Sequence, residues 1–438
     1  MRCKFAGWAA LVALLLTVSA CGGDAQQPLR IGAIVDCVGG LRAFGDGELA
    51  AAQLPLIVRG ARPVSEDPSD GVRGGRVAGR PVEIVRGCSE SGEFSTLTQV
   101  ARQLIEREHV DVIVDGGFFE TDGIALREVA RRYPDVVFVA AANGPREVTL
   151  DRPAGNLYRF APDYGQGVAG LATYAYRRLG WRRIALLPDE WFWGWNAETA
   201  FVREFCALGG RIAKRVPLLV SQEPTSAVVK SIPRGADGVV VLGSFATVTP
   251  DLLGALARRR GTNSLVLGPE VIGDTDLVRQ VPALTGVVAA SYSAPESSSP
   301  AVRAYLRDYA KAYPDTPPGE SRDAVVMAYH NGVEAVLEAF EQVHGDLSDG
   351  RRRLRAQLAR LDTTLLGVPV RMDANRQAVV SANLVRLGPE STSGVPELRA
   401  VQSIPAVDQS IGGLVPASYI PTYGGEPCRR ATPPPWAR

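Results

Sequence analysis

Side chains that carry catalysis or bind metal ions are scarce in this sequence. Its three histidines are His109, His330 and His344, and none of them lies in an HExxH or similar metal-binding spacing. The sequence also lacks a GxSxG nucleophile elbow and a GxxxxGK[ST] phosphate loop, and no helix opens directly from the glycine-rich run 71–75. We therefore expect a protein that is not an enzyme and has no catalytic residue, cofactor or metal site.

An excess of charge of either sign is also missing. Lysine and arginine number 48 against 47 aspartate and glutamate residues, a net charge of +1, so we expect no nucleic-acid partner. Hydrophobic residues make up 46% of the chain and charged residues 22%, which is typical of a folded protein. At 438 residues the chain exceeds the usual size of one hydrophobic core, so two lobes or domains are expected.

The N-terminus holds an apolar run. A short, positively charged segment precedes residues 9–18, which are fewer than the roughly 20 that span a bilayer but typical of a signal peptide. The run ends in Val-Ser-Ala-Cys at 18–21, which resembles a bacterial lipobox. We expect a signal peptide at 1–20, a lipid on Cys21 and a tether at 21–27, and thus a location on the extracytoplasmic face of the cell membrane. A short buried helix that begins the fold is the alternative.

The cysteine pattern favours disulfides over a metal site. Four cysteines remain after the signal peptide and the lipid site: Cys37, Cys88, Cys206 and Cys428. None has CxxC spacing, and an oxidising compartment favours disulfide formation. Cys37 and Cys88 each follow a predicted strand and could meet at one edge of a sheet. We favour the pairs Cys37–Cys88 and Cys206–Cys428, with free buried thiols as the alternative.

Short apolar runs alternate with helix-length segments in the first part of the chain. The predicted strands there are 29–35, 82–85, 110–114 and 136–140. Between them lie helical segments at 95–108 and 124–132. The first has apolar residues at positions i, i+3, i+4, i+7 and i+8 from Leu97, which places them on one helix face. This alternation indicates parallel strands joined by crossover helices.

A second series of the same kind follows residue 159. Its predicted elements are helix 166–179, strand 184–187, helix 197–208, strand 238–242, helix 250–259 and strand 264–267. Two long helices at 299–312 and 322–343 follow, and then two strands at 365–372 and 378–387 around a turn. The fold class is therefore α/β, with two doubly wound parallel-sheet lobes.

The order of these elements and several short motifs resemble type I periplasmic binding proteins, in particular the branched-chain amino acid (Leu/Ile/Val) binding proteins of ABC importers. Leu29–Val35 is similar to the first strand of that family, and Phe44–Asp46 to its aromatic-Gly-Asp turn. Gly79–Val85 is similar to its second strand. Trp193–Gly194 stands where the family has Tyr-Gly, and Gly268–Glu270 resembles its Gly-Pro-Glu. The resemblance extends from about residue 29 to 387.

The resemblance implies a hinge of three chain crossings between the lobes. The first lobe would comprise 28–157 and 290–363, and the second 158–289 and 364–395. The segment 396–438, which lacks clear periodicity, is expected to be an extended C-terminal tail that wraps the second lobe. The ligand would lie between the lobes, at the carboxyl ends of the strands.

Several ligand-binding residues follow from the resemblance. Glu270 would pair with a ligand ammonium group, although a solvated loop acid or a helix cap is the alternative. Phe44, Trp193 and Phe245 stand where the family places aromatic ligand contacts. The run 191–195 holds three tryptophans on an apparent loop, which indicates a binding surface more than core packing.

The sequence departs from the family where the ligand carboxylate would bind. Glu120 replaces a serine there, between Phe119 and Thr121, and would repel a carboxylate; Thr121 takes the role if the loop register differs by one. Asn143 stands in place of a threonine, and Ala141 would offer its backbone N–H. Because Glu120 and Glu270 are both acidic, a cationic or amine-rich ligand becomes a hypothesis.

These observations predict a function in solute uptake. We expect a monomeric, lipid-anchored solute-binding protein that closes around a small polar ligand, an amino acid or a related amine or amide, and delivers it to an ABC transporter permease. A ligand-sensing lipoprotein that presents its ligand to a signalling partner is the alternative. Neighbouring permease and ATPase genes would favour import, and a kinase gene would favour sensing.

Overall fold

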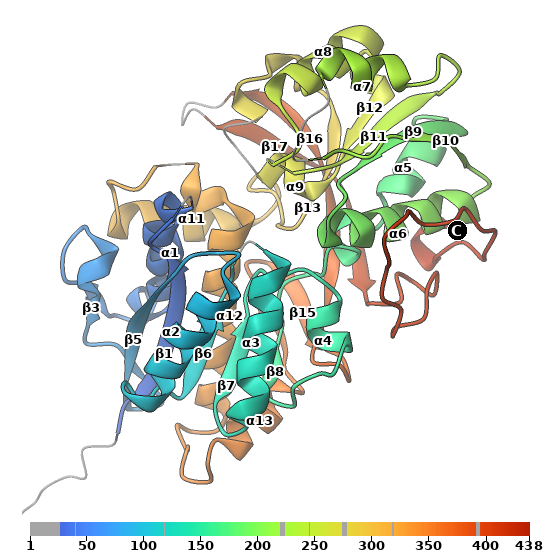
Figure 1. Ribbon diagram of the computed structural model, residues 1–438. Coiled ribbons are helices and arrows are strands. Elements are labelled where there is room, and N and C mark those ends of the chain that lie inside the picture. Colours follow the sequence, from blue (N-terminus) through green and yellow to red (C-terminus); the bar gives the residue numbers. More distant parts are fainter. Residues whose placement is uncertain are drawn as a thin grey trace, which may run out of the picture.

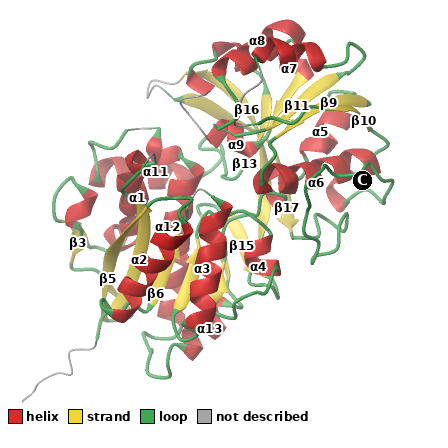
Figure 2. Cartoon of the chain, viewed as in Figure 1, coloured by secondary structure: helices red, strands yellow, loops and turns green. Residues whose placement is uncertain are grey.

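The computed structural model describes residues 27–438, apart from residues 40, 118, 220–223, 245, 274–277, 318 and 391–394. Figure 1 shows two lobes, and Figure 2 shows that helices cover the sheet of each lobe. The expected signal peptide, the lipid site Cys21 and the aromatic residue Phe245 lie outside the described residues. None of the described helices is long and apolar enough to cross a membrane.

The first lobe is built on a sheet with strand order β4-β5-β1-β6-β7-β8. Its strands are β1 (Leu29–Asp36), β4 (Arg76–Val77), β5 (Arg80–Ser89), β6 (Val112–Asp115), β7 (Val137–Ala140) and β8 (Leu157–Tyr158). All neighbours are parallel except β4, which is antiparallel to β5. Every residue of β6 and β7 is buried, which is typical of parallel strands covered on both faces.

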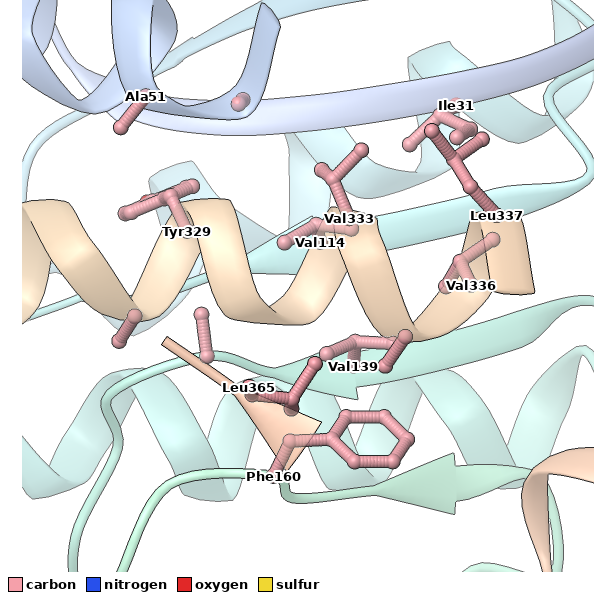
Figure 3. Packing of buried hydrophobic residues seen from close by; sticks show 14 of the residues in the cluster. Ile31, Ala51, Val114, Val139, Phe160, Tyr329, Val333, Val336, Leu337 and Leu365 are labelled. Carbon is pink, nitrogen blue, oxygen red and sulfur yellow. The ribbon is translucent and has the colours of Figure 1, made fainter. Parts of the chain in front are cut away.

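Helices pack on both faces of this sheet. They are α1 (Gly45–Val58), α2 (Phe94–Glu106), α3 (Glu120–Arg132), α4 (Glu147–Leu150), α11 (Pro300–Ala312), α12 (Ala324–Gln342) and α13 (Arg352–Leu358). Helices α1, α11, α12 and α13 share one hydrophobic core with the sheet, and α2 and α3 share another. Figure 3 shows Tyr329, Val333 and Leu337 of α12 beside Val114 and Ile31 of the sheet. The loops after β1, β6 and β7 therefore meet at the carboxyl edge of the sheet.

The second sheet has the order β10-β9-β11-β12-β13-β16-β15-β14, with β17 paired to β16. Its strands are β9 (Arg183–Pro188), β10 (Arg211–Arg215), β11 (Gly238–Leu242), β12 (Leu265–Leu267), β13 (Val288–Ser291), β14 (Asp362–Leu365), β15 (Val368–Met372), β16 (Ala378–Glu390) and β17 (Pro396–Val407). Most of this sheet forms the second lobe, but β14 and β15 pack in the core of the first lobe, so the expected boundary of the second lobe at residue 364 is wrong. Strands β9 to β13 pair in parallel, and β16 is antiparallel to β13. The helices are α5 (Leu171–Arg177), α6 (Phe192–Ala207), α7 (Thr225–Ser231), α8 (Pro250–Arg260) and α9 (Pro269–Gly273). This repeats the doubly wound arrangement expected from the sequence.

The chain passes between the cores of the two lobes at three places. Residues Tyr158 and Phe160 belong to the first-lobe core, whereas Val168 belongs to a second-lobe core. After β13 the chain returns to α11 of the first lobe. Strand β16 makes the third passage, because Val380 packs in the first core and Val385 in the second. These passages form the three-segment hinge of the fold.

Two predicted elements are divided by backbone that turns at positive φ. The helix expected at 166–179 is a 3₁₀ turn followed by α5, because Gly170 has φ 85°. A Cβ at Gly170 would also approach the side chain of Ile404 to 2.6 Å. The strand expected at 365–372 is a hairpin of β14 and β15 that reverses at Leu366 and Gly367, where φ is 46° and 83°.

Two further segments differ from their sequence-based interpretation. The tryptophan-rich run 191–195 is not a loop: α6 begins at Phe192, so most of the run forms its first turn. The segment from Pro396 first forms β17 against β16, and only the remainder continues over the second lobe. Between α1 and β5, a small antiparallel sheet is formed by β2 (Arg62–Pro63) and β3 (Val72–Arg73).

Two disulfides join the cysteine pairs favoured from the sequence. Cys37–Cys88 links the ends of the neighbouring strands β1 and β5, with a Cα–Cα distance of 5.4 Å. Cys206–Cys428 links α6 to the C-terminal segment, with a Cα–Cα distance of 5.5 Å. The second bond fixes that segment to the second lobe, beside which the C-terminus lies in Figure 1.

Candidate functional site

The loop after β7 carries an unsatisfied polar group at the edge of the first sheet. The Asn143 side chain is buried, and its Nδ2 donates to Gly117 O at 2.9 Å. Its Oδ1 has no hydrogen-bond partner among the described residues, and neither does the buried hydroxyl of Thr121 at the start of α3. Such buried oxygens cost stability unless a ligand or water satisfies them. Asn143 and Thr121 are therefore suited to accept hydrogen bonds from a ligand.

The backbone N–H of Ala141 cannot serve the ligand as expected. It donates to Asp115 O at 2.7 Å, as part of the continuation of the β6–β7 pairing. A backbone donor at the end of a parallel strand is commonly used in this way, because the ladder continues for one residue beyond the strand. The Ala141 N–H is therefore already engaged within the first lobe.

Two candidate ligand residues of the first lobe, Phe44 and Phe119, each lie at the start of a helix. Phe44 precedes α1, and Phe119 precedes α3, with its N–H donating to Asp122 Oδ2 at 3.0 Å. The Phe119 side chain is partly exposed. Its ring lies against Gly92, where an added Cβ would come within 3.1 Å of it. Glu120 opens α3, but its side chain lies outside the described part of the structure.

Carboxyl groups gather beneath these loops in the first lobe. Glu48 of α1 is fully buried; one of its oxygens accepts from the Asp36 N–H at 2.8 Å, and the other has no partner among the described residues. Burial raises the pKa of Glu48 well above its usual value, and the nearby charges of Asp36, Asp115 and Asp323 act in the same direction. Burial likewise raises the pKa of Asp115. Sequence motifs did not identify this acidic cluster, although Asp36 and Asp115 each end a strand.

Asp189, directly after β9, organises the facing edge of the second lobe. Its carboxylate accepts hydrogen bonds from the Trp193 indole and the Thr247 hydroxyl. Burial raises the pKa of Asp189 to about 7, although these hydrogen bonds act against the shift. Trp193 is 3% exposed, and its indole N–H donates within its own lobe, so that group is not available to a ligand. Trp191, stacked on it with ring centroids 6.3 Å apart, is 37% exposed.

Glu270 lies in the first turn of α9, where the second lobe faces the first. Its Oε1 accepts from the Tyr292 hydroxyl at 2.6 Å. Burial raises the pKa of Glu270 to about 7; the Tyr292 hydrogen bond opposes the shift, and the charges of Asp323 and Asp189 add to it. Asp323 caps α12 of the first lobe by accepting from the Val325 N–H at 2.7 Å. Glu270 is thus close enough to a carboxylate of the opposite lobe for their charges to interact.

Five of the expected ligand residues lie at the carboxyl edges of the two sheets. Asn143, Thr121 and Phe119 lie at the carboxyl edge of the first sheet, and Trp193 and Glu270 at that of the second. The lobes also touch directly where the Arg146 N–H donates to Asn196 Oδ1 at 3.4 Å.

Besides the acidic cluster around Glu48, the sequence analysis missed three residues around Trp193 and Glu270: Asp189, Tyr292 and Asp323. Asp189 directly follows a predicted strand, so the rule that located Glu270 could also have found it. Asp323 gives no such signal, because it begins a helix and reaches Glu270 only through the folding of the hinge.

Two doubly wound lobes, joined by three crossings and facing each other across polar strand ends, define a solute-binding class of protein. A family model described as "Periplasmic binding protein" matches residues 28–391, so the chain belongs to the periplasmic binding protein family. The family consists of extracytoplasmic solute-binding proteins of ABC transporters, which are not enzymes.

Solved structures share this fold at low sequence identity. An ABC transporter substrate-binding protein from Sphaerobacter thermophilus is 22% identical, with a TM-score of 0.74 over 87% of this chain and 98% of that chain. A solute-binding protein from R. palustris in complex with 4-hydroxybenzoate is 19% identical, with a TM-score of 0.71 over 87% and 98%. A leucine-binding protein from Thermotoga maritima is 20% identical, with a TM-score of 0.65 over 86% and 99%. Comparison with curated proteins gave no match.

Proposed function

We propose that this chain is a lipid-anchored solute-binding protein that captures a small ligand bearing an amino group and delivers it to the permease of an ABC importer. The ligand class is an amino acid or a related amine or amide. Family membership supports the binding role, and the lipobox-like run ending at Cys21 supports the anchor. Closure of the lobes on the ligand would present the closed form to the permease.

The observation that carries this proposal is the environment of Glu270. Its carboxylate accepts a hydrogen bond from the Tyr292 hydroxyl. The nearby charges that act on it, those of Asp323 and Asp189, are both negative. Glu270 is partly exposed, and closing the lobes on a ligand would remove its carboxylate from water. Because that is unfavourable without a cationic partner, the site favours a ligand that supplies a positive group. A charge-assisted hydrogen bond from an ammonium group would meet that need.

The structural neighbours suggest two types of ligand, an amino acid and an aromatic acid. One neighbour is a leucine-binding protein, and another holds 4-hydroxybenzoate, an aromatic acid. The acidic residues of this chain disfavour a ligand that is only an anion. At the start of α3, the sequence has Glu120 where the resemblance implies a serine that would meet a carboxylate. We therefore favour a ligand with an amino group.

Calorimetric titration with amines and amino acids tests the role of Glu270. Glu270→Gln should weaken binding of an amino-bearing ligand at least about tenfold, or about 1.4 kcal/mol, because the amide cannot pair with a cation. Glu66→Gln changes an exposed acid between β2 and β3; it is the matched control and should bind like the parent protein. Unchanged affinity in Glu270→Gln would refute the role of this carboxylate.

The lipid anchor has its own test. Cys21→Ala removes the thiol that would carry the lipid, so we expect the protein to move from the membrane fraction to the soluble fraction of lysed cells. Unchanged membrane association of this variant would contradict the anchor without affecting the binding site.

A further inference from the structure

A cavity of about 640 Å³ lies where the two lobes meet beside α9. Its walls come from both lobes: Ile272 and Leu387 belong to the core of the second lobe, and Val302, Leu306 and Met327 to the core of the first. The passage of the chain from β13 to α11 forms the wall between them. The volume is within the range of about 300–1,000 Å³ that is usual for small-molecule sites.

The lining of this cavity is mainly apolar. The five side chains just named are each at most 8% exposed, and prolines, alanines and valines fill much of the remaining surface. Three of the four charged residues that line it belong to ion pairs: Arg322 pairs with Glu296 at 3.1 Å, and Glu397 pairs with Arg399 at 2.8 Å, whereas the fourth, Arg303, meets only backbone carbonyls among the described residues. Arg303 donates to Glu296 O at 2.7 Å. The cavity therefore offers burial to an uncharged, apolar group.

Tyr292 connects this cavity to the acidic site. Its side chain lines the cavity, and its hydroxyl donates to Glu270 at 2.6 Å. Pro269 and Ile272, on either side of Glu270 in α9, also line the cavity. A molecule bound against Tyr292 could thus reach a carboxylate with one end and an apolar space with the other.

We infer that the solute is an amphipathic amine, whose amino group binds at Glu270 and whose apolar part fills the cavity between Ile272, Leu306 and Met327. This inference rests on the proposed function, because it assumes that the ligand binds between the lobes. It specifies what that function leaves open, namely that the rest of the molecule is uncharged and apolar. Free polyamines and short hydrophilic amino acids are then poor ligands.

Packing explains why an apolar ligand would favour closure. Protein interiors are close-packed, so the apolar side chains that line a space of this size between the two cores lack many van der Waals contacts. A ligand that fills it touches both cores at once and stabilises the arrangement in which they face each other. A charged group placed against the apolar wall formed by Ile272, Leu306 and Met327 would lose its hydration without gaining a charged partner there.

A series of linear amines tests the inference directly. Calorimetric titration of the mature protein with propylamine, butylamine, hexylamine and octylamine should show affinity rising about fourfold for each added methylene, which corresponds to about 0.8 kcal/mol, until the cavity is full. 1,6-Diaminohexane should bind at least about tenfold more weakly than hexylamine, because its second ammonium group would enter the apolar space.

Cavity variants localise the effect. Leu306→Trp on one wall and Ile272→Phe on the other each occupy part of the cavity, and either should reduce octylamine affinity at least about tenfold while leaving propylamine binding in place. Leu219→Trp, at an exposed position in the second lobe, is the matched control. If one filled variant does not fold, the other and the series on the parent protein still give the result.

The outcomes separate the two proposals. Equal affinity for all chain lengths, or tighter binding of 1,6-diaminohexane than of hexylamine, would overturn the apolar assignment and leave the amine-binding function intact. Binding of hexanoate with no response to any amine would overturn both.

Discussion

Arg159, in the first passage between the lobes, donates from its Nη1 to the backbone carbonyl of Asn143 at 2.6 Å. The same nitrogen donates to Pro145 O at 2.6 Å, and Nε donates to the Gln377 side chain in the third passage. Arg159 is fully buried. The hinge is therefore hydrogen-bonded to the loop that carries Asn143, a candidate ligand residue. The position of Asn143 thus depends on the arrangement of the hinge.

Replacing Arg159 should affect both stability and binding. Arg159→Met leaves two buried carbonyls and Gln377 without their donor, so we expect the free energy of unfolding to fall by about 3 kcal/mol or more. Ligand affinity should also fall, because the Asn143 loop loses its support. Urea denaturation measures the first effect, with exposed Arg152→Met as the control. A variant that unfolds at the same urea concentration as the parent would contradict this role.

Ligand binding should depend on pH through Glu270. Its pKa of about 7 means that the carboxyl is largely protonated at pH 6 and largely ionised at pH 8 in the free protein. A cationic ligand pairs with the ionised form, so its affinity should be about tenfold lower at pH 6 than at pH 8. Calorimetry across this range checks the slope, and Glu270→Gln should show a flatter profile. Affinity that rises on acidification would be inconsistent with a cation at this residue.

The stability of the ligand-free protein should change in the opposite direction. Asp189 and Glu270 have pKa values of about 7 when folded, whereas in the unfolded chain both titrate near pH 4. Between these values the folded protein binds more protons, so these groups lower the free energy of unfolding as pH rises from about 4 to 7. Urea denaturation at pH 5 and pH 8 measures the change. The change should be smaller in the double variant Asp189→Asn, Glu270→Gln, and an identical pH dependence in parent and variant would rule it out.

The second disulfide should stabilise the fold through the C-terminal segment. Besides Cys206–Cys428, this segment is held where Glu426 pairs with Arg203 at 2.5 Å and where Arg177 donates to Ala437 O at 2.6 Å. Cys206→Ser with Cys428→Ser should lower the free energy of unfolding by about 2–4 kcal/mol. Denaturation of this variant, compared with the parent protein, gives the value. No loss of stability would show that the other contacts suffice.

Periodic apolar patterns predicted the buried parts of the fold. The alternation of apolar runs and helical segments indicated the two doubly wound lobes, because strands such as β6 and β11 are buried along their whole length. Strand β17 was not predicted because most of its residues are not buried, so they carry no apolar alternation. The break at Gly170 depends on its packing against Ile404, a contact between segments far apart in sequence that no local pattern reports.

The candidate site was predictable in position but not in hydrogen bonding. The rule that ligand residues follow strands located Asn143 and Glu270. It could not show that the Ala141 N–H and the Trp193 indole already have partners, because those partners, Asp115 and Asp189, become neighbours only in the folded lobes.

The most direct test of this account is a crystal structure of the protein with hexylamine bound. We expect the amine nitrogen within about 2.7–2.9 Å of a Glu270 carboxylate oxygen and the hydrocarbon chain against Leu306 and Met327. A structure with the amine bound elsewhere, and Glu270 bonded only to Tyr292, would contradict the central claim.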